Sequence, residues 1–121
     1  MAETKVYPTD VALSAASGKM LCASFDAVHE IVTDLAGWPV MTHHMASDEL
    51  MDAVQAKVVR QVSWMPGAIE NMPDFAYETR AEAEAAVRAY TARIAAAHGE
   101  TVELDLGEPL PPLGLFAGLD R

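Results

Sequence analysis

Helical periodicity is the strongest constraint on this chain, and residues 25–36 show it best. Apolar side chains recur there at intervals of three and four, which places them on one face of a helix: Phe25, Val28, Ile31, Val32 and Leu35. Ser24 is suited to cap the start of this helix, and Gly37 followed by Pro39 is suited to end it. We predict a core-facing helix here, with His29 off its main apolar face.

Three other segments have the same order of cap, apolar stripe and stop signal. The predicted helices cover residues 9–16, 24–36, 47–64 and 79–98, and the prolines of residues 65–78 predict a loop there. Thr9 or Asp10 is the expected cap of the first helix. In the third helix the apolar stripe repeats every fourth residue from Leu50, and Lys57 is expected to lie off it.

Residues 101–106 are the one segment that alternates as a strand does, with Val102, Leu104 and Leu106 on one side. A strand needs a partner, which must come from residues 5–7, 20–22 or 40–42, or from a second chain. We therefore predict an α+β fold, mostly helical, with about four helices packed around one core and a short strand near the C-terminus. Residues 1–121 form a single domain, with mobile residues 1–8 and a Pro/Gly-rich tail over 107–121.

The charge balance excludes several classes of function. Eight basic residues stand against 18 acidic ones, so the formal net charge is −10. Neutralising nucleic-acid phosphates or anionic lipids requires clustered Lys and Arg, so we predict neither direct nucleic-acid binding nor membrane binding. The first residues lack an apolar signal core, and the single cysteine suits a reducing compartment. The expected location is the cytoplasm.

Cys22, His29, His43 and His44 are the residues that most resemble metal ligands or catalytic groups. Zinc sites require three or four donors that converge, commonly from short paired spacings such as HExxH. Here the spacings are long, and adjacent histidines point in different directions. We predict no metal, no cofactor and no catalytic residue, and interpret His43 and His29 as a polar joint between helices, with His44 exposed. A small metal-dependent enzyme using His29, His43 and Cys22 is the disfavoured alternative.

Acidic residues gather near the C-terminus, where no Lys or Arg separates Arg93 from Arg121. Four of them are the candidate partner-binding residues: Glu100, Glu103, Asp105 and Glu108. Such an acidic strand edge suits a basic groove on a protein partner. It equally suits a solvated edge that like charge protects against aggregation.

Short motifs in the first half resemble a family of small bacteriophage and prophage proteins, through "TGRLLC"-like and "FTHQL"-like stretches. The matching positions are Leu13, Ser14, Gly18, Leu21, Cys22, His29, Gly37, Thr42 and His43. Lys19 stands where the family has arginine, and His44 is an additional histidine. The resemblance brings no catalytic residue with it.

The resemblance implies a phage accessory protein in the cytoplasm of an infected bacterial host. The leading expectation is an anti-defence, anti-CRISPR-like inhibitor that is not an enzyme. It would block a basic, nucleic-acid-handling surface of a host defence effector, such as a CRISPR–Cas complex, by stoichiometric contact. The alternative is a phage structural or regulatory protein that forms homo-oligomers through its strand and apolar tail.

Overall fold

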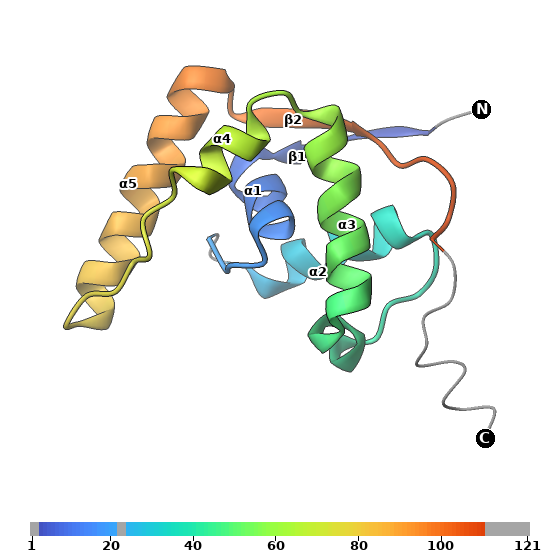
Figure 1. Cartoon of the computed structure of the whole chain (residues 1–121), viewed down its shortest axis with the longest axis horizontal. Helices are drawn as coiled ribbons and strands as arrows, with labels where there is room; N and C mark the ends of the chain where they lie inside the picture. The colour runs from blue at the N-terminus through green and yellow to red at the C-terminus, as the bar shows by residue number, and fades with distance from the viewer. Residues whose placement is uncertain (1–2, 22–23, 111–121) are drawn as a thin grey trace.

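The computed structural model describes residues 3–21 and 24–110 of the chain (Figure 1). Within that part, five α-helices, one 3-10 helix and two strands follow one another in this order: β1 (Thr4–Pro8), α1 (Thr9–Ser17), α2 (Phe25–Ala36), η1 (Thr42–Ala46), α3 (Asp48–Gln61), α4 (Met65–Glu70), α5 (Arg80–His98) and β2 (Thr101–Asp105). The predicted α+β, mostly helical class with a strand near the C-terminus is confirmed.

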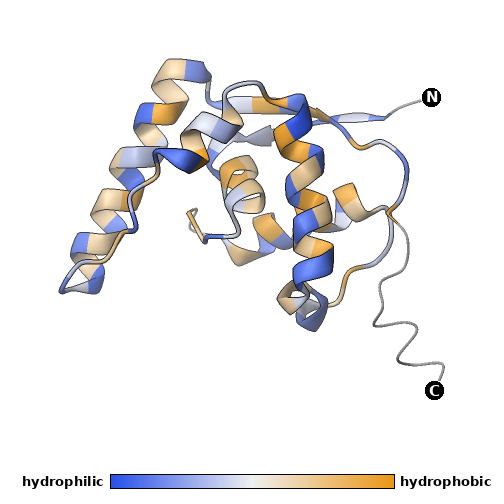
Figure 2. Ribbon diagram, viewed as in Figure 1, coloured by the Kyte–Doolittle hydropathy of each residue, from blue (hydrophilic) through white to orange (hydrophobic). Residues whose placement is uncertain are grey.

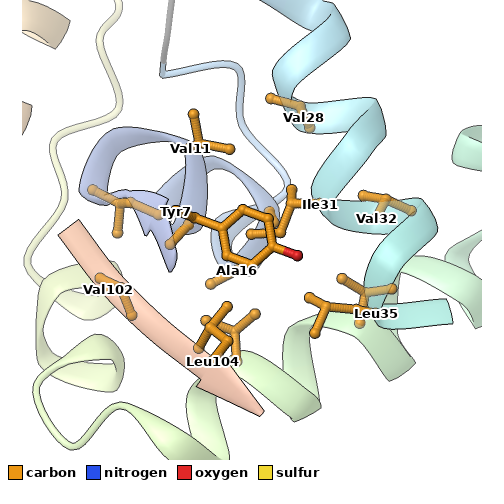
Figure 3. Packing of buried hydrophobic residues seen from close by; sticks show 14 of the residues in the cluster. Tyr7, Val11, Ala16, Val28, Ile31, Val32, Leu35, Val102 and Leu104 are labelled. Carbon is orange, nitrogen blue, oxygen red and sulfur yellow. The ribbon is translucent and has the colours of Figure 1, made fainter. Parts of the chain in front are cut away.

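Helix α1 occupies the centre of the fold. Seven of its nine residues are buried, and it contacts α2, α3, α4 and α5. Figure 3 shows Val11 and Ala16 of this helix packed among side chains from α2 and β2. The buried hydroxyl of Ser14 donates to the Asp10 carbonyl at 2.7 Å and accepts the Leu21 amide at 3.0 Å. The burial of this polar group is therefore offset by hydrogen bonds.

Serine and threonine caps begin three helices as predicted. The side chains of Ser24, Ser47 and Thr79 each accept an amide hydrogen from the first turn that follows. The predicted cap of α1 is wrong, because Pro8 occupies that position and no side chain caps the helix. Thr9 instead donates its hydroxyl to the Gly99 carbonyl, which ties α1 to the end of α5.

The two strands form an antiparallel pair in which Tyr7 faces Val102 and Lys5 faces Leu104. Of the alternative partners, the segment that contains residues 5–7 is the one that pairs with residues 101–105. Within the segment expected to be mobile, residues 4–8 form β1 and bury Tyr7. Hydrogen bonds flank the ladder from Leu106 to Glu3 and from Thr9 to Glu100. Every second residue of an antiparallel strand directs its main-chain amide and carbonyl toward the neighbouring strand. Thr9 bonds toward β2, so the backbone of Pro8 faces away from it, and the missing amide hydrogen of Pro8 costs no hydrogen bond of the sheet.

Three further predictions are corrected. Residues 65–70 form the helix α4 and not a loop, and α3 ends at Gln61, before Trp64. Phe25, predicted to face the core, is the first residue of α2 and is 47% exposed. The start of the expected tail is held in place, since the Leu110 amide donates to the Ala36 carbonyl at 2.7 Å. Residues 111–121, including the apolar Leu113, Leu115, Phe116 and Leu119, lie outside the described residues.

Candidate functional site

Four acidic residues on and beside β2 form the candidate site, which we call the acidic surface: Glu100, Glu103, Asp105 and Glu108. Val102 and Leu104 point into the core, so the alternation of the strand turns Glu103 and Asp105 to its opposite face. Two residues of strand separate their Cα atoms by about 7 Å. Glu100 precedes the strand and Glu108 follows it, and both are exposed.

The main chain beneath the acidic surface is held at both ends. The Glu100 carbonyl accepts the Thr9 amide at 2.9 Å, and the Glu108 carbonyl accepts the Lys57 ammonium at 2.7 Å. Between them the side-chain amide of Gln61 bonds both main-chain groups of Asp105, accepting from its amide and donating to its carbonyl. Gln61 thus takes the place of a neighbouring strand at this point on the edge of β2.

Most charges of the acidic surface have no partner in the described part of the chain. Among the described residues, the carboxylates of Glu100, Glu103 and Glu108 make no ion pair and no hydrogen bond. Asp105 differs, because its Oδ1 accepts the Gly107 amide at 2.8 Å and so shapes the turn after β2. Ordered main chain with unpaired carboxylates is suited to binding cationic groups of a partner.

Lys57 lies in the interior, contrary to the prediction from its sequence. It was expected to lie off the apolar stripe, but it is 6% exposed and donates to three carbonyls. The acceptors are Leu35, Leu106 and Glu108, at 2.6–2.7 Å. Burial is the main cause that lowers the pKa of Lys57, followed by the nearby charge of Arg60. Its spacing of seven residues from Leu50 and three from Val54 is the signal for a core-facing position.

A second polar cluster joins β1 to α2. The Asp34 carboxylate accepts the Lys5 ammonium at 2.8 Å and the Tyr7 hydroxyl at 2.7 Å, and Glu30 pairs with Lys5 at 3.3 Å. The hydroxyl of Tyr7 points toward α2 in Figure 3. Burial and then the hydrogen bond to Asp34 raise the pKa of Tyr7, while the hydrogen bond to Asp34 raises that of Lys5. Because each group has a partner, we interpret this cluster as a structural link.

Three histidines lie on or beside η1: His43 and His44 belong to it, and His29 lies on α2. His44, expected to be exposed, is 7% exposed, and its Nδ1 accepts the Met41 amide at 3.0 Å. The Trp38 ring lies edge-on to it at 5.7 Å. Burial, and then the neighbouring His43, lowers the pKa of His44. His43 is exposed, and Nε2 of His29 lies 2.5 Å from the Val40 carbonyl.

The predicted site residues thus lie on different elements of the fold. The acidic residues lie on or beside β2, whereas His29 lies on α2 and His43 on η1. Across residues 3–21 and 24–110, no three His, Cys, Asp or Glu side chains are grouped as metal ligands would be. Cys22, the third member of the disfavoured metal site, lies outside the described residues. None of the described helices is long and apolar enough to cross a membrane.

The fold and these clusters define a small, mostly helical α+β domain with an acidic sheet face. The chain belongs to a family described as a domain of unknown function, DUF7736, whose model matches residues 7–68. Neither a curated protein nor a solved structure matches the chain. The matched region holds α1 to α3 and the histidine joint, while the acidic surface lies beyond it.

Proposed function

We propose that this protein is a non-enzymatic inhibitor that binds a basic surface of a partner protein through its acidic surface. The observation that carries the proposal is that the carboxylates of Glu100, Glu103 and Glu108 stand on fixed main chain and are unpaired within the part of the chain that the structure describes. Carboxylates at strand spacing meet Lys and Arg side chains that would otherwise contact phosphates. Because little main-chain order must be gained on binding, little affinity is lost to ordering.

The narrower form of the proposal names the partner as a bacterial defence effector. It is supported by the resemblance of the first half of the chain to small bacteriophage and prophage proteins. A CRISPR–Cas complex is a suitable target, since its channels for guide and target strands are positively charged. The protein would then act as an anti-CRISPR protein in the cytoplasm of an infected bacterium.

The decisive test removes the acidic surface without removing the turn at Asp105. In the triple variant Glu103→Lys, Asp105→Asn and Glu108→Lys, the asparagine oxygen still accepts the Gly107 amide. We expect this variant to lose capture of a CRISPR–Cas effector from lysates of bacteria with active defence systems. The wild type should capture the effector and inhibit its target cleavage, and its association should slow as salt rises.

A matched control with the same change in charge is available on another face. Asp74 also accepts an amide two residues ahead, from Ala76 at 3.1 Å, so Glu70→Lys, Asp74→Asn and Glu78→Lys repeats the chemistry of the test variant. This control should bind as the wild type does. If both variants lose capture of the effector equally, the loss is due to net charge and not to the acidic surface. If the test variant captures the effector as well as the wild type does, the acidic surface is not the binding site.

A further inference from the structure

Helix α5 is largely uncovered. Two of its 19 residues, Tyr90 and Ile94, are buried, and α1 is the helix with which it makes most of its contacts. Figure 1 shows it at one side of the molecule, and in Figure 2 hydrophilic bands recur along its length. Since packing supplies most of the stability of a helix in a protein, a helix with so little burial gains from further contact.

A groove of about 770 Å³ opens beside this helix. One wall is a stripe of α5 side chains whose spacing places them on a single helical face: Arg80, Ala83, Glu84, Val87, Arg88 and Thr91. The opposite wall includes Met20 and Phe25, which are 48% and 47% exposed. The groove therefore combines apolar side chains with charges of both signs along its α5 wall.

The charges of this stripe are complementary to those of a second, antiparallel copy of the same helix. Glu84 and Arg88 lie one turn apart on the same face. Glu84 pairs with Arg80 at 2.9 Å, whereas the Arg88 guanidinium makes no ion pair with any described residue. Around a two-fold axis near Val87, two antiparallel copies of α5 would place Glu84 of each copy against Arg88 of the other. Alanines along the helix allow the close approach that such packing requires.

We propose that the groove is the seat of a second copy of this chain, which docks its α5 against the α5 stripe and the wall of Met20 and Phe25. The contact is isologous, with Val87 of both copies at its centre and two Glu84–Arg88 pairs beside it. Phe25 and Met20 cover the outer side of the incoming helix. This inference does not rest on the acidic surface, because the stripe and β2 share no residue.

Charge reversal with complementation tests the proposal. At micromolar to millimolar concentrations the wild type should show twice its 13.0 kDa mass by sedimentation equilibrium. Glu84→Arg and Arg88→Glu should each raise the dissociation constant about tenfold or more, because two like-charge contacts replace two attractive ones. An equimolar mixture of the two variants should form a heterodimer, since each brings the charge that the other lacks.

Arg93→Glu is the matched control, as a charge reversal on α5 outside the groove, and it should leave the dimer intact. Phe25→Ser, on the opposite wall, should weaken the dimer and leave the fold intact, because the Phe25 side chain is 47% exposed. Circular dichroism establishes that each variant is folded. A wild type that stays at 13.0 kDa at every concentration overturns the proposal. So does a dimer indifferent to both reversals, or a mixture that fails to associate.

Discussion

Lys57 brings a positive charge into the interior with main-chain carbonyls as its partners. The three acceptors belong to separate parts of the chain: Leu35 in the last turn of α2, and Leu106 and Glu108 after β2. Carbonyls in the last turn of a helix have no partner within the helix and lie at the negative end of its dipole. One side chain thus satisfies groups that the fold leaves unpaired.

Replacing Lys57 with an uncharged residue of similar length should leave those carbonyls without a hydrogen-bond donor. We expect Lys57→Met to lower the free energy of unfolding by about 2–4 kcal/mol, as measured by urea denaturation. Arg60→Met, an exposed change on the same helix, should cost less than about 0.5 kcal/mol. Equal stability of Lys57→Met and the wild type would show that water replaces the ammonium without loss.

His44 should make stability depend on pH near neutrality. Its pKa lies below the ordinary value of 6.5, because burial and His43 disfavour its charged form. When the pH falls through 6.5, the unfolded chain takes up a proton on His44 that the folded protein resists, so the free energy of unfolding decreases. Protonation would also remove the acceptor for the Met41 amide.

The comparison to make is with His44→Asn, whose side-chain oxygen can accept the same amide but does not titrate. The loss of stability between pH 7 and pH 5 should be smaller in this variant than in the wild type. All other titratable groups are present in both proteins, so their contributions largely cancel in the difference. Parallel pH profiles would show that His44 is not the source of the dependence.

At the scale of elements, the residues that end a helix also make contacts with other parts of the chain. Gly37 follows α2 with φ of +80°, and a Cβ placed on it would lie 2.7 Å from the Cα of Pro109. The Trp38 indole then donates to the Leu110 carbonyl at 3.1 Å. The C-terminal end of α2 is therefore also the site against which the segment after β2 packs.

Gly18, which closes α1, provides a direct comparison for this contact. Its φ is +75°, but the nearest atom to an added Cβ is the flexible Gln55 amide at 3.1 Å. Gly18→Ala should cost about 1 kcal/mol through its left-handed backbone alone. Gly37→Ala should cost at least about 1 kcal/mol more, because Pro109 must also move. Equal unfolding midpoints for the two variants would contradict a tight contact at Pro109.

At the scale of the whole molecule, periodicity predicted the long helices, the strand β2 and the fold class, because these depend on local pattern. Segment 65–70 was misread because its Pro and Gly are signals of a break, yet Pro66 sits in the first turn of α4, where no amide hydrogen is required. Lys57 was misplaced because charge outweighed spacing in its assignment. Alternation predicted that Glu103 and Asp105 lie on the face of β2 opposite Val102 and Leu104, and the burial pattern of the strand agrees. The anchors of this segment at Gln61 and Lys57 depend on tertiary contacts that no local pattern contains.

The pairing of β1 with β2 has a consequence for synthesis on the ribosome. Thr4 is synthesised long before its partner Asp105, because α1 to α5 lie between them in the sequence. The sheet therefore cannot close until β2 has left the exit tunnel, and Tyr7 must wait for Val102 opposite it. Helices α1 to α3 can associate earlier, since their contacts are nearer in sequence. Until β2 emerges, the nascent chain exposes β1 as an unpaired strand, and that interval is when it most needs a chaperone.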